Sequence, residues 1–240
     1  MLRVELVKIL KLPTPRWVFI VTFLAVLAGS VAVVVLKPSG TDINWYVDAP
    51  SLAAQILGPV GAIILGAWVA GLDFSSRTIR LTATMQPSRG RMLDAKLLAA
   101  LALVVVFVLF AFGLAFGAAK GCTLYGDVPF PVEQQLRDFG GQALQAALWG
   151  MFAFSIALLL RSYVAGLVVA LVLAIGVDFL LQQIPTVGRY TFGSATTSLS
   201  DSIALKSAEF PVGQAAGIAV VWLAVIFLLG ALRFRHGDLA

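Results

Sequence analysis

Six runs of about 20 mostly apolar residues constrain this chain more than any other feature of its sequence. They cover residues 17–36, 52–71, 97–119, 140–160, 163–181 and 212–232, and only the fifth contains a charged residue, Asp178. An α-helix of about 20 residues crosses the roughly 30 Å hydrocarbon core of a bilayer. With 60% hydrophobic and 12% charged residues, the sequence predicts an all-α, polytopic membrane protein: one transmembrane domain, residues 1–240, with six transmembrane helices.

The basic residues divide unevenly between the two sides of these spans. With the N-terminus inside, 12 of the 17 Lys and Arg residues fall on the cytoplasmic side, and five fall outside: Lys37, Lys120, Arg137, Arg189 and Lys206. Short cytoplasmic loops carry an excess of Lys and Arg. We therefore expect both termini to be cytoplasmic.

The residue types argue against several kinds of chemistry. Cys122 is the only cysteine and His236 the only histidine, too few for an internal disulfide or a Cys/His zinc site. No Gly-x4-Gly-Lys-Ser/Thr phosphate loop is present. We expect no catalytic residues, metal or cofactor in this chain. The chain has a net charge of +5. In a membrane protein this charge indicates basic loops that lie beside anionic lipid headgroups, and it does not indicate nucleic-acid binding.

The segments outside the spans differ in character. Residues 1–16 predict an interfacial helix on the inner leaflet, because Leu2, Leu6 and Ile9 share one helical face, and Pro13 and Pro15 form a hinge before the first span. The basic flank of a signal anchor is the alternative. Residues 182–211 form a long extracytoplasmic loop without a strong helical period. This loop has room for a short re-entrant or interfacial piece.

Two features within the spans each leave two interpretations open. Asp178 either lines a translocation cavity or lies at the outer helix end beside Gln182 and Gln183, because an acid in the bilayer interior is costly. Gly-x3-Gly spacings either mark close helix contacts or arise by chance among 22 glycines. They occur at Gly113, Gly117, Gly121, Gly213 and Gly217.

Residues 73–96, between the second and third spans, hold the densest cluster of charge. Helical spacing places Arg77, Arg80 and Thr84 on one side, and Pro87 ends this short helix. We interpret residues 73–96 as a basic, amphipathic cytoplasmic loop that docks on a soluble partner, with arginines as oriented donors. A positive loop that only sets the membrane topology is the alternative.

The order acid-x4-Thr-x-Arg-x6-Pro-x-Arg, with Ala-Lys at the start of the third span, resembles the ABC type 2 permease family. The matching positions are Asp73, Thr78, Arg80, Pro87, Ser88, Arg89, Ala95 and Lys96. The chain departs from the family pattern in two places. It has Asp73 where members commonly have Glu, and Ser76–Arg77 where members commonly have a Gly before Thr-x-Arg.

The resemblance implies the transmembrane permease subunit of an ABC exporter in a bacterial inner membrane. Two permeases, identical or related, would each dock on a separate ATPase subunit that binds ATP and Mg²⁺. The coupling helix would lie at about 75–85, and the docking residues would be Asp73, Arg77, Thr78, Arg80, Pro87, Arg89 and Arg91. Spans two and five border the central cavity of such exporters, so Gln55, Trp68 and Asp178 become candidate substrate-path residues.

The apolar spans suit an amphipathic or lipophilic cargo such as an antibiotic, a peptide or a lipid. Two other functions fit the same spans. One is a six-span scaffold, immunity or sensor protein that docks a different cytoplasmic partner. The other is a secondary transporter, for which Asp178 alone supplies few intramembrane polar groups.

Overall fold

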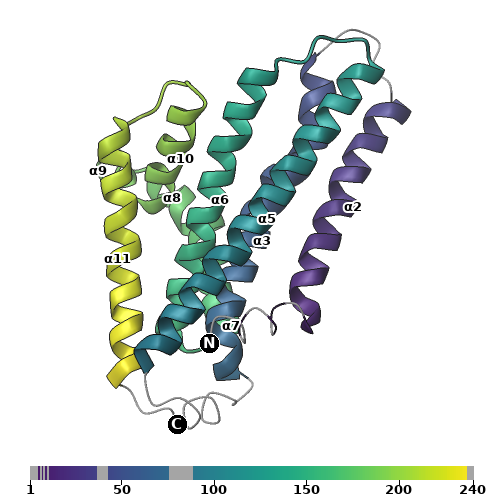
Figure 1. Ribbon diagram of the computed structural model, residues 1–240. Coiled ribbons are helices and arrows are strands. Elements are labelled where there is room, and N and C mark those ends of the chain that lie inside the picture. The colour runs from purple at the N-terminus through teal and green to yellow at the C-terminus, as the bar shows by residue number, and fades with distance from the viewer. Residues whose placement is uncertain are drawn as a thin grey trace.

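The protein is a bundle of long helices (Figure 1). The computed structural model describes Glu5, Val7, Ile9 and residues 11–36, 43–75 and 89–236. Within these residues there is no strand, and six helices are long and apolar enough to cross a membrane. The predicted all-α fold with six transmembrane helices is therefore confirmed.

Five of the spans are single helices that extend beyond the apolar runs of the sequence. They are α2 (Pro13–Leu36), α3 (Ile43–Ser75), α5 (Arg89–Tyr125), α6 (Val132–Leu160) and α11 (Val212–His236). Helix α5 has 37 residues, which at 1.5 Å each make it about 55 Å long against roughly 30 Å of hydrocarbon. The apolar runs are therefore parts of longer helices.

The two ends of the bundle differ in charge. At one end α2 begins and α3, α6 and α11 finish, and in the sequence this end carries Arg16, Arg89, Arg91, Lys96, Arg161 and Arg233 (Figure 1). We call it the basic end. The opposite end, which we call the outer end, holds the connection between α5 and α6.

The fifth span is built from three pieces. Helix α7 (Tyr163–Leu171) continues into a π-helical segment, Val172–Val177, and then into α8 (Asp178–Gln182). In the π segment the N–H of Asp178 bonds to the carbonyl of Leu173, five residues earlier, which widens the helix. Two further helices, α9 (Pro185–Gly188) and α10 (Phe192–Ile203), lie inside the predicted long loop.

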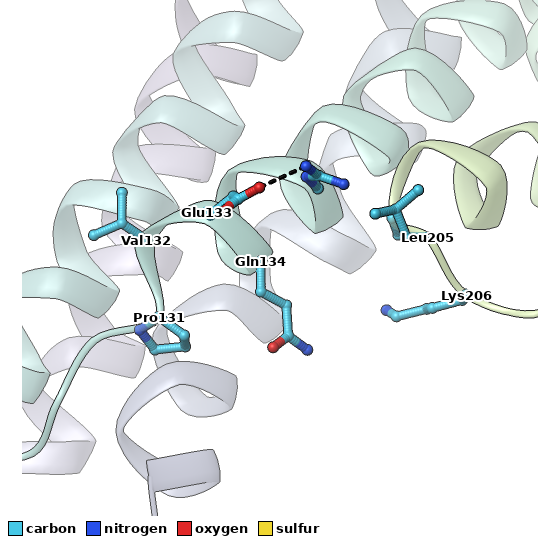
Figure 2. A pocket seen from close by; sticks show the side chains of 8 residues that line it. Pro131, Val132, Glu133, Gln134, Leu205 and Lys206 are labelled. Carbon is cyan, nitrogen blue, oxygen red and sulfur yellow. Dashed lines mark hydrogen bonds and ion pairs between the residues drawn. The ribbon is translucent and has the colours of Figure 1, made fainter.

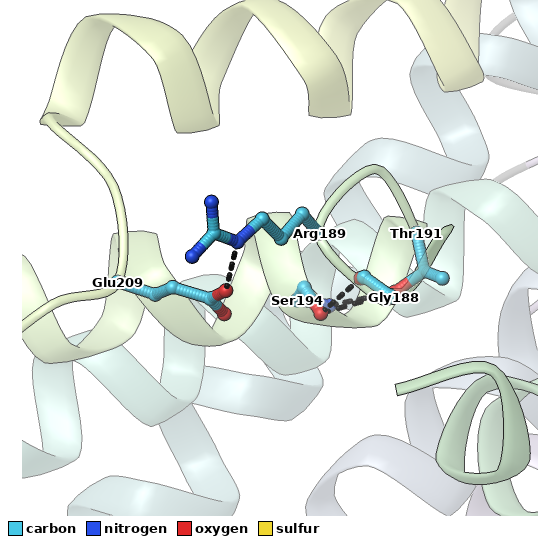
Figure 3. Close-up of polar contacts among 5 residues, drawn as sticks. All are labelled: Gly188, Arg189, Thr191, Ser194 and Glu209. Carbon is cyan, nitrogen blue, oxygen red and sulfur yellow. Dashed lines mark hydrogen bonds and ion pairs between the residues drawn. The ribbon is translucent and has the colours of Figure 1, made fainter. Parts of the chain in front are cut away.

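Helix α10 is difficult to recognise in the sequence because serine and threonine occupy several of its buried positions. Ser194, Thr196 and Ser198 are all buried. At its N-terminus the Thr191 side chain accepts a bond from Ser194 N–H at 3.2 Å, and Ser194 Oγ donates to the Gly188 carbonyl at 2.7 Å (Figure 3). Local bonds thus satisfy the hydroxyls of Thr191, Ser194 and Thr196, so these side chains are tolerated inside the protein.

Helix α3 is the centre of the bundle, since it packs against α2, α5, α6 and α7. Its closest approach is to α6, where a Cβ built on Gly66 would overlap the carbonyl of Gly150. A glycine at this position lets the two backbones touch. The five glycines of the Gly-x3-Gly spacings behave differently, because a Cβ built on any of them meets no described atom within 4 Å.

Candidate functional site

Three charged side chains form a buried ion cluster at the basic end. The Lys96 ammonium donates a hydrogen bond to Asp73 Oδ2 and lies 3.6 Å from Glu5 Oε1. The side chains of Lys96 and Asp73 are 1% exposed, and that of Glu5 is 5% exposed. We call these three residues the Lys96 cluster.

The helix ends explain why these charges meet. Asp73 lies two residues before the end of α3, Lys96 lies two turns after the start of α5, and the two helices pack side by side. The Lys96 stem is surrounded by residues such as Leu93 and Ala99, which are buried. A buried ammonium is tolerated when it is paired. The Lys96 cluster therefore joins the two ends of segment 76–88 to the N-terminal segment.

The structure describes only part of the predicted docking surface. Arg77, Thr78, Arg80 and Pro87, and almost all of the expected coupling helix at 75–85, lie outside the described residues. Asp73 is buried in the Lys96 cluster, Arg89 is the first residue of α5, and Arg91 is exposed on α5. Arg91 is thus the member of this set whose described side chain is accessible.

The predicted interfacial helix at 1–16 is described at only some of its positions. Glu5 and Ile9 are helical and buried, whereas Val7 and Lys11 are helical and exposed. Helix α2 starts at Pro13, and a bend at Leu12 precedes it. Proline fits the first turn of a helix, since its missing N–H has no partner there. The placement of residues 1–16 on a membrane surface stays a prediction.

A second polar link at the basic end joins α6 to α11. The Arg161 guanidinium donates to the carbonyl of Arg233, and Arg233 Nη1 donates to the carbonyl of Leu159 at 2.8 Å. Arg161 has a φ of 53° and caps the C-terminus of α6. The two arginines thereby satisfy carbonyls at the ends of both helices.

The three predicted substrate-path residues lie in different surroundings. Gln55 is exposed on α3 and lines a polar cavity at the outer end, while Trp68 is 3% exposed and packs in the apolar core. Asp178, 9% exposed, accepts bonds from Gly193 N–H at 3.0 Å and from Gln182 Nε2 at 2.6 Å. The structure does not bring the three together in one described cavity.

We expect Asp178 to act through the position of α10. Replacing it with Val leaves the buried N–H of Gly193 without its acceptor, at a cost of about 1.5–3 kcal/mol for a bond to a charged group. The melting temperature in detergent should fall, whereas Asp178→Asn, which keeps one acceptor oxygen, should retain most of the stability. Loss of transport with an unchanged melting temperature in Asp178→Val would instead indicate a direct role in the cargo path.

The polar cavity at the outer end lies between α3, α6 and α10 and measures about 270 Å³. Its polar lining includes Gln55, Asp138, Gln142, Gln145, Asp201 and Lys206. The last five are not among the substrate-path residues predicted from the sequence. A sequence signal exists for three of them, because Asp138, Gln142 and Gln145 recur at helical spacing, and Gln142 and Gln145 lie within a run that is mostly apolar.

The six spanning helices in the described part of the chain define a polytopic membrane protein. A family model described as ABC-2 family transporter protein matches residues 1–177, and the chain belongs to this family. No significant match is found among curated proteins. ABC-2 permeases are in general non-catalytic membrane subunits that associate with an ABC ATPase subunit. The resemblance seen in the sequence is thus confirmed.

Proposed function

We propose that this chain is the membrane-spanning permease subunit of an ABC exporter. It pairs with a second permease, an identical copy or a related chain, and carries an amphipathic or lipophilic substrate across a bacterial inner membrane. A separate ATPase subunit binds ATP and Mg²⁺ and docks on the cytoplasmic segment 73–96. The basic end is the cytoplasmic end, which agrees with the positive-inside rule.

The observation that carries this proposal is the Lys96 cluster. Segment 76–88 leaves α3 after Ser75 and returns at Arg89, and the Asp73–Lys96 pair joins α3 to α5 two residues before the first point and two turns after the second. A force on the segment therefore acts on α3 and α5 together. Since α3 also packs against α2, α6 and α7, movement at the docking surface reaches most of the bundle. Packed helices and ion pairs of this kind carry energetic coupling between distant sites.

We expect Arg80→Glu to uncouple ATP turnover from transport without reducing expression, because it reverses the charge of an oriented donor on the docking segment. The chain is purified from its native membrane in mild detergent, and co-purifying subunits are identified by mass spectrometry. ATPase activity and transport are then measured. Lys11→Glu makes the same charge change at an exposed position outside segment 73–96 and serves as the control.

The results separate the two functions. A co-purifying ATPase subunit, with transport lost in Arg80→Glu and kept in Lys11→Glu, supports the permease proposal. Normal transport by Arg80→Glu would remove Arg80 from the coupling surface. If the wild-type chain purifies alone or with an unrelated protein, and crosslinking recovers no ATPase, the docking scaffold replaces the exporter.

A further inference from the structure

The polar cavity at the outer end carries more negative than positive charge. Its lining has two carboxylates, Asp138 and Asp201, and one ammonium, Lys206. Lys206 Nζ lies 2.8 Å from Asp138 Oδ1. Among the described residues, Asp201 has no basic side chain within ion-pairing distance. One negative charge in the cavity is therefore left uncompensated.

Among the described residues, one of the three amides that line the same cavity has a buried acceptor without a donor. Gln55 Nε2 donates to Ser51 Oγ at 3.2 Å, and Gln145 Nε2 donates to Thr197 Oγ1 at 3.0 Å. Gln142 Oε1 is buried, and no donor in the described part of the chain reaches it. A buried acceptor without a donor is costly. Gln142 Oε1 therefore favours a ligand that donates a hydrogen bond to it.

The cavity has an apolar wall and an opening. Pro59 and Phe112, from α3 and α5, line it beside the polar groups. A second depression of about 580 Å³ shares Ala204 and Lys206 with it (Figure 2). Near the start of α6 it is lined by Pro131, Val132, Glu133, Gln134 and Arg137. In Figure 2 Lys206 and Gln134 point toward each other across this outer depression. Lys206 thus lies where the polar cavity meets the outer surface.

We propose that this cavity binds the protonated amine of an amphipathic molecule. The ammonium supplies the positive charge and the donors that Asp201 and Gln142 lack, and the adjoining apolar part packs on Phe112 and Pro59. A volume of about 270 Å³ admits a small head group, since one water takes about 30 Å³ in the liquid. The inference deepens the proposed function and rests on it where the amine belongs to the cargo. An aminolipid of the bilayer presents the same chemistry.

The test is binding of radiolabelled octylamine to the purified wild-type chain in phosphatidylcholine nanodiscs, by equilibrium dialysis against protein-free nanodiscs. We expect saturable binding above simple partitioning, and none for octanol. Asp201→Asn should weaken the affinity about five- to tenfold, and Lys206→Gln, which removes the competing ammonium, should strengthen it by a similar factor. Asp48→Asn, an exposed acid near the same end of α3, should change nothing.

Opposite shifts in Asp201→Asn and Lys206→Gln support the site. Binding that does not saturate, or that is equal in wild type and Asp201→Asn, overturns it. Displacement of octylamine by phosphatidylethanolamine in the nanodiscs assigns the site to a bilayer lipid. Octylamine-stimulated ATPase activity of the complex assigns it to cargo. Octylamine binding is measured on the purified chain without its partners. Failure to recover an ATPase subunit would therefore refute the proposed function without affecting the binding result.

Discussion

Gly66→Leu is expected to be among the most damaging single substitutions in this protein. Its side chain would begin inside the carbonyl of Gly150, and this neighbour is backbone that no rotamer change can move. Helices α3 and α6 would have to separate. The cost should reach or exceed the roughly 1–3 kcal/mol typical of overpacked cores, because α3 also holds α2, α5 and α7. Thermal unfolding in detergent and size-exclusion chromatography measure the effect.

Gly113→Leu is the matched control for this experiment. It makes the same change within a span, but a Cβ at Gly113 meets no described atom within 4 Å, and the residue is exposed. We expect its melting temperature to stay near that of the wild type. Gly66→Ala should lie between the two variants. Equal effects of Leu at positions 66 and 113 would refute the close α3–α6 crossing.

Lys96→Met is expected to destabilise the protein by about 3–5 kcal/mol, the usual cost of removing one partner from a buried ion pair. Methionine keeps the length and apolar contacts of the lysine stem but takes the ammonium away from Asp73 and Glu5. The melting temperature of the purified chain should fall clearly. Any surviving protein should show weakened coupling between ATPase activity and transport.

Two further variants give the Lys96 prediction its control. Arg91→Met removes an exposed positive charge from the same helix and should change the melting temperature little, since exposed charges contribute weakly. The double variant Asp73→Asn with Lys96→Met should recover part of the lost stability, because it leaves fewer buried charges unpaired. Losses that simply add in the double variant would show that Asp73 and Lys96 do not stabilise each other.

The polar groups at the two ends of the bundle were only partly evident in the sequence. Asp73 and Lys96 could be noted as motif positions, but their pairing with each other and with Glu5 depends on how α3, α5 and the N-terminal segment pack. At the outer end, Asp201 and Lys206 looked like residues of a long loop. They join a cavity because α10 folds against α6, where Phe192 stacks on Phe152 with ring centroids 4.4 Å apart.

The sequence alone determined the class of protein and the number of spans. The free energy of transferring about 20 apolar residues into lipid depends on those residues alone, so each run predicts its own span. The motif between the second and third spans adds the resemblance to the permease family. Only the tertiary structure decided which helix faces meet. In a span that is apolar on every side, periodicity does not separate an exposed glycine such as Gly113 from one that touches another backbone, such as Gly66. That distinction, the Lys96 cluster and the outer cavity all arise from contacts between distant segments.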